Sequence, residues 1–250
     1  QIGQFAFQDC EKVEKAALPS TVSSIGQHAF YNCGSLQEMQ IPEGVVQIDS
    51  RLFSGCTNLK SVKLPDSITS ISYDAFRYCS NLTELVLPAK LKEIGSNAFS
   101  GCKSLTKLDI PKTVTSIGSG AFSGCSALTS VNIPKGLVRI NSDTFSNCSG
   151  LIEVVIPNGV LSIEPSAFSG CSGLESVSIP DSVTSIGWDA FRDCSGLTNV
   201  TIPNSVTSIG SSAFENCTSL TSIKIPDSVT SIGAGAFSGC TVLTGATILG

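Results

Sequence analysis

The chain has 250 residues, 41% of them apolar and 14% charged, so it is neither a disordered chain nor a strongly charged one. Its net charge is −5: residues 1–125 carry 11 basic and 11 acidic side chains, and residues 126–250 carry 4 and 9. Nucleic-acid-binding proteins gather Lys and Arg on one face, so this balance argues against a nucleic-acid partner.

The N-terminus, QIGQFAFQDC, has no basic segment followed by an apolar one, which is the pattern of a secretion leader. It begins in the middle of a repeat, and we therefore expect the chain to be a fragment of a longer protein. No apolar run approaches the ~20 residues that a membrane-spanning helix needs, so we expect no transmembrane segment in this fragment.

A period of 23 residues runs through the whole chain. Every gap between successive cysteines is 23 residues, eleven of the twelve phenylalanines stand three residues before a cysteine, and ten of the eleven prolines follow the same period. The cysteines are Cys10, Cys33, Cys56, Cys79, Cys102, Cys125, Cys148, Cys171, Cys194, Cys217 and Cys240. Such a period predicts one solenoid domain over residues 1–250, with about eleven coils.

The unit begins with an alternating segment, seen in one copy as Val177 and Ile179, which predicts a half-buried strand. Pro180 follows and ends the strand because it has no N–H to donate. V-x-x-I-G then predicts a second short extended segment. Its closing position is mostly Gly, as at Gly187, and we expect a positive φ there. S-x-A-F-x-x-C closes the unit, and we expect a single helical turn that directs Ala, Phe and Cys inward.

One 23-residue unit cannot enclose a core, but stacked copies can, because each lays its Leu, Val, Ile and Phe on those of its neighbours. The expected fold is a β-rich α/β repeat. It is a right-handed solenoid with a parallel concave sheet, and with short second extended segments and one-turn helices on the other side.

Copies such as IPDSVTSIGWDAFRDCSGLTNVTIP (179–203) and IPDSVTSIGAGAFSGCTVLT (225–244) resemble BspA-like, or Treponema-type, leucine-rich repeats. The resemblance covers the whole chain. It implies a cell-surface or secreted protein that adheres to host matrix proteins or to other cells.

The cysteine column predicts a ladder of buried, reduced thiols. Equivalent residues on adjacent coils lie about 4.8 Å apart with parallel side chains, so their Cβ atoms do not approach the ~3.8 Å of a disulfide. One straight column cannot surround a metal ion either. We expect no metal and no cofactor.

Nothing in the sequence predicts an active site. The single histidine, His28, stands in a column of mixed residues, which is typical of a solvent-facing position, and nucleophilic catalysis needs a base beside its nucleophile. We therefore expect no enzyme activity.

Two columns of the first strand vary in charge and size, and they are the candidate contacts for a protein partner on the concave face. The candidates are Glu38, Gln40, Lys63, Glu84, Val86, Lys107, Asp109, Asn132, Glu153 and Val155. The alternative is a solvated strand face whose polar residues have drifted without selection.

Trp188, the only tryptophan, and Tyr73 share another column, and each has an arginine four residues on, Arg192 and Arg77. On a helical turn such residues share a face, so we expect each ring to stack under its guanidinium. A protein contact is the alternative role for these four residues.

Two functions remain open. The first is a non-enzymatic protein-binding scaffold, part of a surface adhesin. The second is a structural spacer that projects another domain.

Overall fold

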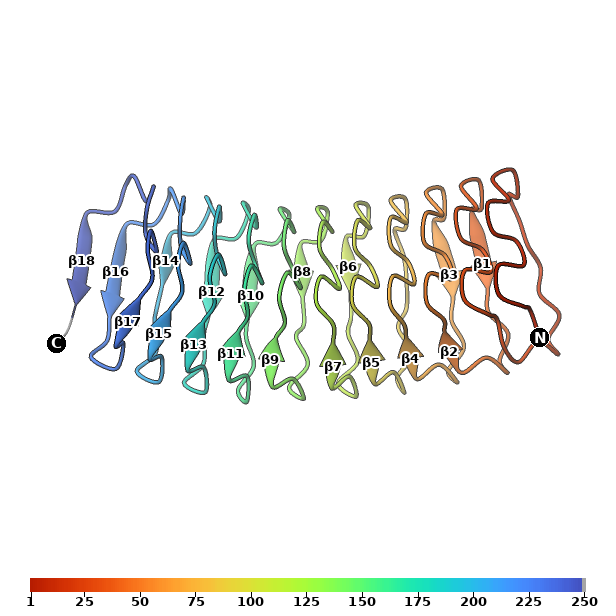
Figure 1. Ribbon diagram of the computed structural model, residues 1–250, viewed down its shortest axis with the longest axis horizontal. Helices are drawn as coiled ribbons and strands as arrows, with labels where there is room; N and C mark the ends of the chain where they lie inside the picture. The colour runs from red at the N-terminus through yellow and green to blue at the C-terminus, as the bar shows by residue number, and fades with distance from the viewer. Residues whose placement is uncertain (249–250) are drawn as a thin grey trace.

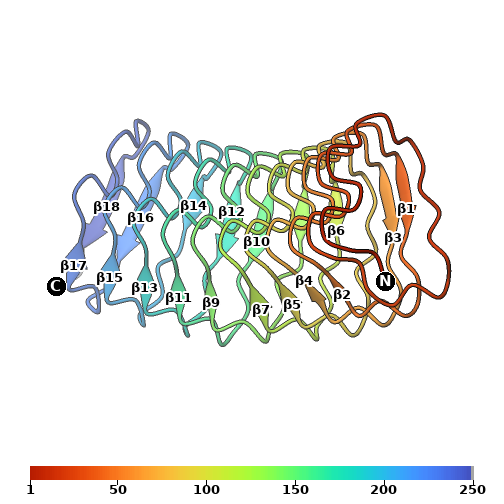
Figure 2. The same cartoon turned by 45° about the vertical axis from the view of Figure 1, so that its right-hand side comes forward.

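The structure is a computed structural model that describes residues 1–248, and in it the chain winds into one continuous solenoid. Coils stack in chain order, so the two termini lie at opposite ends of the long axis (Figure 1). Most coils contribute a front strand and, later in the chain, a back strand, and Figure 2 shows the two rows on different sides of the solenoid.

The front strands are β1 (Glu38–Gln40), β3 (Ser61–Lys63), β6 (Lys107–Leu108), β8 (Ser130–Val131), β10 (Glu153–Val155), β12 (Ser176–Ser178), β14 (Asn199–Val200), β16 (Ser222–Ile225) and β18 (Gly245–Ile248). The back strands are β2 (Gln47–Ile48), β4 (Ser70–Ile71), β5 (Glu93–Ile94), β7 (Ser116–Ile117), β9 (Arg139–Ile140), β11 (Ser162–Ile163), β13 (Ser185–Ile186), β15 (Ser208–Ile209) and β17 (Ser231–Ile232).

All strand pairs are parallel and join residues 23 positions apart, as Val154 with Val177 and Ile186 with Ile209. The front strands form the groups β1–β3, β6–β8 and β10–β12–β14–β16–β18, and the back strands form β2–β4–β5–β7 and β9–β11–β13–β15–β17. The pairing confirms the period and the two extended segments predicted from the sequence. It also shows that neither row is one unbroken sheet.

The core is a set of columns that run through the coils. The phenylalanine rings stack with centroids 5.1 to 5.9 Å apart from Phe7 to Phe237, and those from Phe30 to Phe214 are almost fully buried. Each interior thiol donates to the carbonyl of a phenylalanine in the preceding coil, as Cys125 Sγ does to Phe99 O at 3.2 Å. Ala, Phe and Cys therefore point inward, as the sequence predicts.

The predicted one-turn helix is wrong, because the described residues contain no helix. In residues 187–194, for example, Asp189 and Asp193 have φ values of 54° and 58°, which a right-handed helix does not accommodate. Arg192 N donates to Asp189 O within the coil, whereas Phe191 N donates to Ala213 O in the next coil at 2.7 Å. The segment is a run of turns whose alternate N–H groups tie one coil to the next.

The predicted positive φ at the glycine after the back strand is also wrong. Positive φ values occur two and six residues later, at Asp189 and Asp193 in the same copy, and not at Gly187. The glycine is needed for a close approach instead. A Cβ added to Gly118 would lie 2.3 Å from the backbone nitrogen of Ser96 in the preceding coil. Only hydrogen fits in that space.

Candidate interaction surfaces

The outward residues of the front strands form one continuous surface, which we call the front face. All ten candidate contact residues on it are exposed, and Val86 is 83% exposed. Alternation along each strand explains this orientation, because Met39, Val62 and Val154 between them point into the core.

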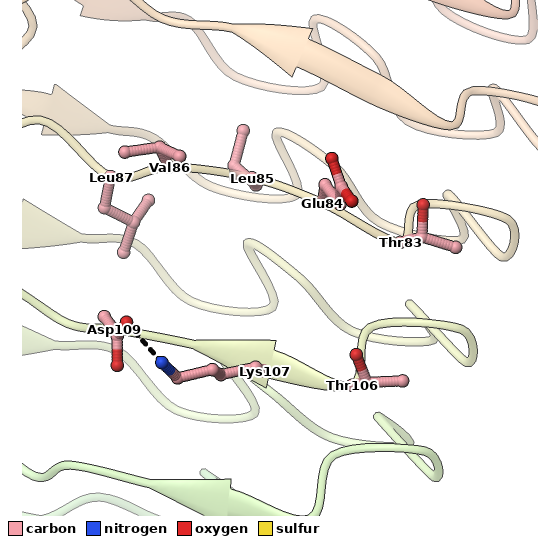
Figure 3. Close-up of a pocket in the computed structure, with 8 residues that line it drawn as sticks. All are labelled: Thr83, Glu84, Leu85, Val86, Leu87, Thr106, Lys107 and Asp109. Carbon is pink, nitrogen blue, oxygen red and sulfur yellow. Dashed lines mark ion pairs between the residues drawn. The ribbon is translucent and has the colours of Figure 1, made fainter.

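Three open grooves lie along the front face. One, of about 400 Å³, separates residues 83–87 from residues 106–109 and includes Glu84, Val86, Lys107 and Asp109 (Figure 3). A second, of about 460 Å³, includes Glu38, Gln40 and Lys63. A third, of about 740 Å³, includes Asn132 and Val155. Nine of the ten candidates line a groove, and Glu153 is the exception.

The groove in Figure 3 lies where the front row is interrupted. Thr83 N donates to Lys60 O, and Thr129 N donates to Thr106 O, each across one coil boundary. Within residues 1–248 no equivalent bond joins Thr106 N to Thr83 O. The Lys107 and Asp109 side chains form an ion pair of 2.9 Å beside this opening. Two of the three charged residues that line the groove are therefore already partnered within the chain.

The side chain of Asn132 forms hydrogen bonds to Ile110 in the preceding coil. Its Oδ1 accepts from Ile110 N at 2.9 Å, and its Nδ2 donates to Ile110 O at 2.8 Å. The side-chain amide thus continues the pairing of β6 with β8 as far as Ile110, and Asn132 has a structural role in addition to its exposure.

The second candidate surface differs from the prediction in its contacts. Arg77 lies over Tyr78, 4.8 Å from the ring centroid, and Tyr73 receives Arg51 of the preceding coil at 5.2 Å. The predicted pairs at a spacing of four residues depended on the helical turn, which does not form. Arg192 instead makes ion pairs with Asp189, Asp193 and Glu215, and Trp188 is 55% exposed.

The column of His28 is not uniformly solvent-facing, contrary to the sequence prediction. His28 is half-buried, and Asp74, two coils further along the same column, is 1% exposed. Burial, followed by the charge of Arg51, lowers the pKa of His28. Sequence reasoning missed the buried Asp74, although an arginine 23 residues before it and another three residues after it gave a signal.

All eleven cysteines are free thiols, and those from Cys33 to Cys217 are buried. Burial raises the pKa of Cys33 to about 11 and that of Cys171 to about 12. No group of three metal-ligating side chains occurs within residues 1–248. In the same part of the chain, no helix is long and apolar enough to cross a membrane.

A stack of 23-residue coils with parallel strands and a buried Phe–Cys ladder defines a leucine-rich-repeat solenoid. Residues 1–129 and 115–244 match the family described as BspA type Leucine rich repeat region (6 copies). The chain belongs to this family.

Solved structures of bacterial leucine-rich repeat proteins are similar to this chain. A protein from Bacteroides ovatus ATCC 8483 is 32% identical with a TM-score of 0.86, and the match covers 91% of this chain and 64% of the Bacteroides ovatus chain. A leucine rich cell surface protein from Faecalibacterium prausnitzii A2-165 is 30% identical with a TM-score of 0.64, and the match covers 100% of this chain and 69% of that protein. The T. pallidum leucine-rich repeat protein is 32% identical with a TM-score of 0.56, and the match covers 72% of this chain and 76% of that protein.

The chain thus spans slightly less than two thirds of the Bacteroides ovatus protein. The comparison with curated proteins gives no match.

Proposed function

We propose that this chain is a non-enzymatic protein-binding scaffold, part of a cell-surface or secreted adhesin, and that its front face between Glu38 and Val155 contacts the partner. The observation that carries the proposal is the coincidence of the variable columns with the grooves, which nine of the ten candidates line. Repeat proteins of this kind use their extended sheet surfaces for binding.

The charge pattern of the front face favours a protein partner. Glu38, Lys63, Glu84, Lys107 and Glu153 alternate in sign along it, and Val86 and Val155 add exposed apolar surface. A polyanion would be bound by one sign of charge, whereas a protein surface presents both. The proposed location draws on the Faecalibacterium prausnitzii relative, which is described as a cell surface protein.

The test compares two variants in a solid-phase binding assay with purified extracellular matrix proteins and with intact host or neighbouring cells. The first variant replaces Lys63, Glu84, Val86 and Lys107 with serine. The matched control replaces Asn199, Thr201 and Lys224 with serine, at the same columns of later coils. We expect the first variant to lose binding and the control to retain it, with melting temperatures nearly unchanged, because exposed substitutions cost under ~0.5 kcal/mol each.

Equal binding by both variants would move the contact away from the front face. If the unmodified chain binds neither the matrix proteins nor the cells, the alternative applies and this segment is a structural spacer that projects another domain.

A further inference from the structure

A second cluster of side chains lies outside the front face, on the turn segments of three successive coils. We call it the arginine–tyrosine patch and define it as Tyr31, Arg51, Tyr73, Asp74, Arg77 and Tyr78, with His28 at its edge. It holds all three tyrosines of the chain, its only histidine and two of its four arginines. The same columns of later coils hold a second group of large side chains around Trp188 and Arg192, but no tyrosine.

Asp74 organises the patch. Its side chain is only 2% exposed, and its Oδ2 accepts from Arg51 Nε at 3.0 Å and from Arg77 Nη1 at 3.5 Å. Arg77 Nη2 also donates to Tyr78 OH at 3.0 Å. The carboxylate therefore holds two guanidinium groups from adjacent coils in fixed positions, each beside a tyrosine ring.

The patch is also the one place in residues 1–248 where buried side-chain polar atoms lack partners. The three such atoms are His28 Nδ1, Asp74 Oδ1 and Arg77 Nε. Buried polar groups are nearly always hydrogen-bonded in folded proteins, so three such atoms around one carboxylate mark this cluster as unusual.

Arg51 has bonding capacity to spare. Its Nε is paired with Asp74 Oδ2, its guanidinium lies against Tyr73, and its side chain is still 40% exposed. Its Nη1 and Nη2 form a planar fork of the kind that binds a carboxylate in a bidentate way. Asp49, two residues earlier, accepts from Gln47 Nε2 and does not form an ion pair with this guanidinium.

We propose that the arginine–tyrosine patch is a second protein-docking site, which takes an exposed acidic segment of another protein through Arg51 and packs against Tyr73 and Tyr78. The two rings are 42% and 52% exposed, and rigid tyrosine and arginine side chains are the usual anchors of protein interfaces. None of the patch residues lines the front-face grooves, so the site is independent of the front face.

An acidic polysaccharide is the other ligand class with suitable charge. The patch favours a protein over it because two arginines around a buried carboxylate make a single anion site, whereas a polyanion is held by a run of cations.

The experiment uses the complete 250-residue chain labelled with ¹⁵N and a synthetic peptide that presents glutamates separated by leucines. A second peptide replaces each glutamate with glutamine. We expect the glutamate peptide to shift the Nε–Hε signal of Arg51 and the amide signals around Tyr78, and the glutamine peptide to leave them in place.

Arg51→Gln should weaken binding of the glutamate peptide about tenfold or more, since it removes the fork and a charge-assisted hydrogen bond. Arg51→Lys should weaken it less, because it keeps the charge and loses the bidentate geometry. The matched control is Arg139→Gln, which removes an exposed arginine paired only with Glu164 and should change affinity less than about twofold. Circular dichroism and thermal unfolding verify that each variant is folded.

The proposal is wrong if Arg51→Gln and Arg139→Gln have the same effect, if both peptides bind equally, or if the shifted signals lie on the front face. It is also wrong if a sulfated polysaccharide shifts the patch signals and the glutamate peptide does not. The serine variant of the front face should bind the glutamate peptide normally, so failure of either proposal leaves the other standing.

Discussion

The two halves of the solenoid share one core and differ in how their strands are grouped and in the residues of their exposed columns. Before about residue 140 the front strands form short groups, and the exposed columns carry Lys, Glu, Arg and Tyr. From β9 in the back row and from β10 in the front row, each row forms a five-stranded parallel sheet. There the outer columns are largely Ser and Thr, whose hydroxyls bond the preceding coil, as Thr207 Oγ1 does to Thr184 O at 3.2 Å.

The phenylalanine and thiol ladders cross both halves without a change of spacing. Ring centroids are 5.6 Å apart from Phe99 to Phe122 and 5.2 Å apart from Phe191 to Phe214. Breaks in the strand rows therefore do not interrupt the core. The difference between the halves indicates that the core maintains the fold while the surface columns vary, which is the separation that a binding scaffold requires.

The largest expected effect tests the shared core. Raising the pH above about 9 should lower the free energy of unfolding steeply, because unfolded thiols lose protons near pH 8.5 to 9. Burial raises the pKa of Cys33 to about 11 and that of Cys217 to about 12, so the folded state keeps its protons. The stabilising effect is complete below the unfolded pKa and is lost as the pH rises through the folded pKa. Each thiol contributes about 1.4 kcal/mol per pH unit between the two values.

Urea unfolding at pH 8, 9 and 10 measures this dependence. Cys125→Ala should reduce the slope by one thiol's share, whereas Cys240→Ala, at a half-exposed position where burial raises the thiol pKa, should reduce it less. A free energy of unfolding that stays constant from pH 8 to 10 would contradict the buried-thiol explanation.

The second prediction compares how much one buried phenylalanine stabilises each half. Phe122→Ala and Phe191→Ala should each cost about 3–5 kcal/mol, because both rings are buried between two stacked neighbours. Denaturant unfolding measures both values. If Phe122→Ala costs much less than Phe191→Ala, the interrupted strand rows have loosened the first half after all.

The third prediction compares the stability cost of two substitutions in one exposed column, one in each half. Asn132→Ala removes both hydrogen bonds to Ile110 and should cost about 1–2 kcal/mol. Ser178→Ala, in the same column two coils later, removes no side-chain hydrogen bond and should cost less than ~0.5 kcal/mol. Similar costs for the two variants in thermal unfolding would mean that the amide of Asn132 does not strengthen the pairing of β6 with β8.

The sequence predicts the columns because a period of 23 residues makes each position's environment repeat. Burial of Phe122, exposure of Val86 and parallel pairing in register all follow from that period. The turn segments were mispredicted because S-x-A-F-x-x-C has the composition of a helical turn. The bonds that define the segment go to the next coil, as Phe191 N to Ala213 O, and a single copy does not contain that partner.

For the candidate sites too, features set within one coil could be predicted and features that depend on contacts between coils could not. Exposure of the front-face residues could be predicted because strand alternation is local, whereas the groove beside Lys107 depends on a boundary that lost its backbone bonds. The error at Tyr73 has the same cause. Arg51 reaches that ring from 22 residues away, across a coil boundary, whereas a spacing of four residues points only to the arginine within the same coil.

The smallest expected effect returns to the two exposed aromatics of one column. Trp188→Ser should change stability by less than ~0.5 kcal/mol, because no arginine of residues 1–248 lies over its ring and serine already occupies this column at Ser119 and Ser211. Tyr73→Ser should cost about 0.5–1 kcal/mol, since it removes the contact with Arg51 at 5.2 Å. Thermal unfolding of the two variants side by side gives the difference. A larger loss of stability for Trp188→Ser would show that the tryptophan packs within its own coil. At this column, the contrast between varied exposed residues in the first half and mostly Ser and Thr in the second would then no longer hold.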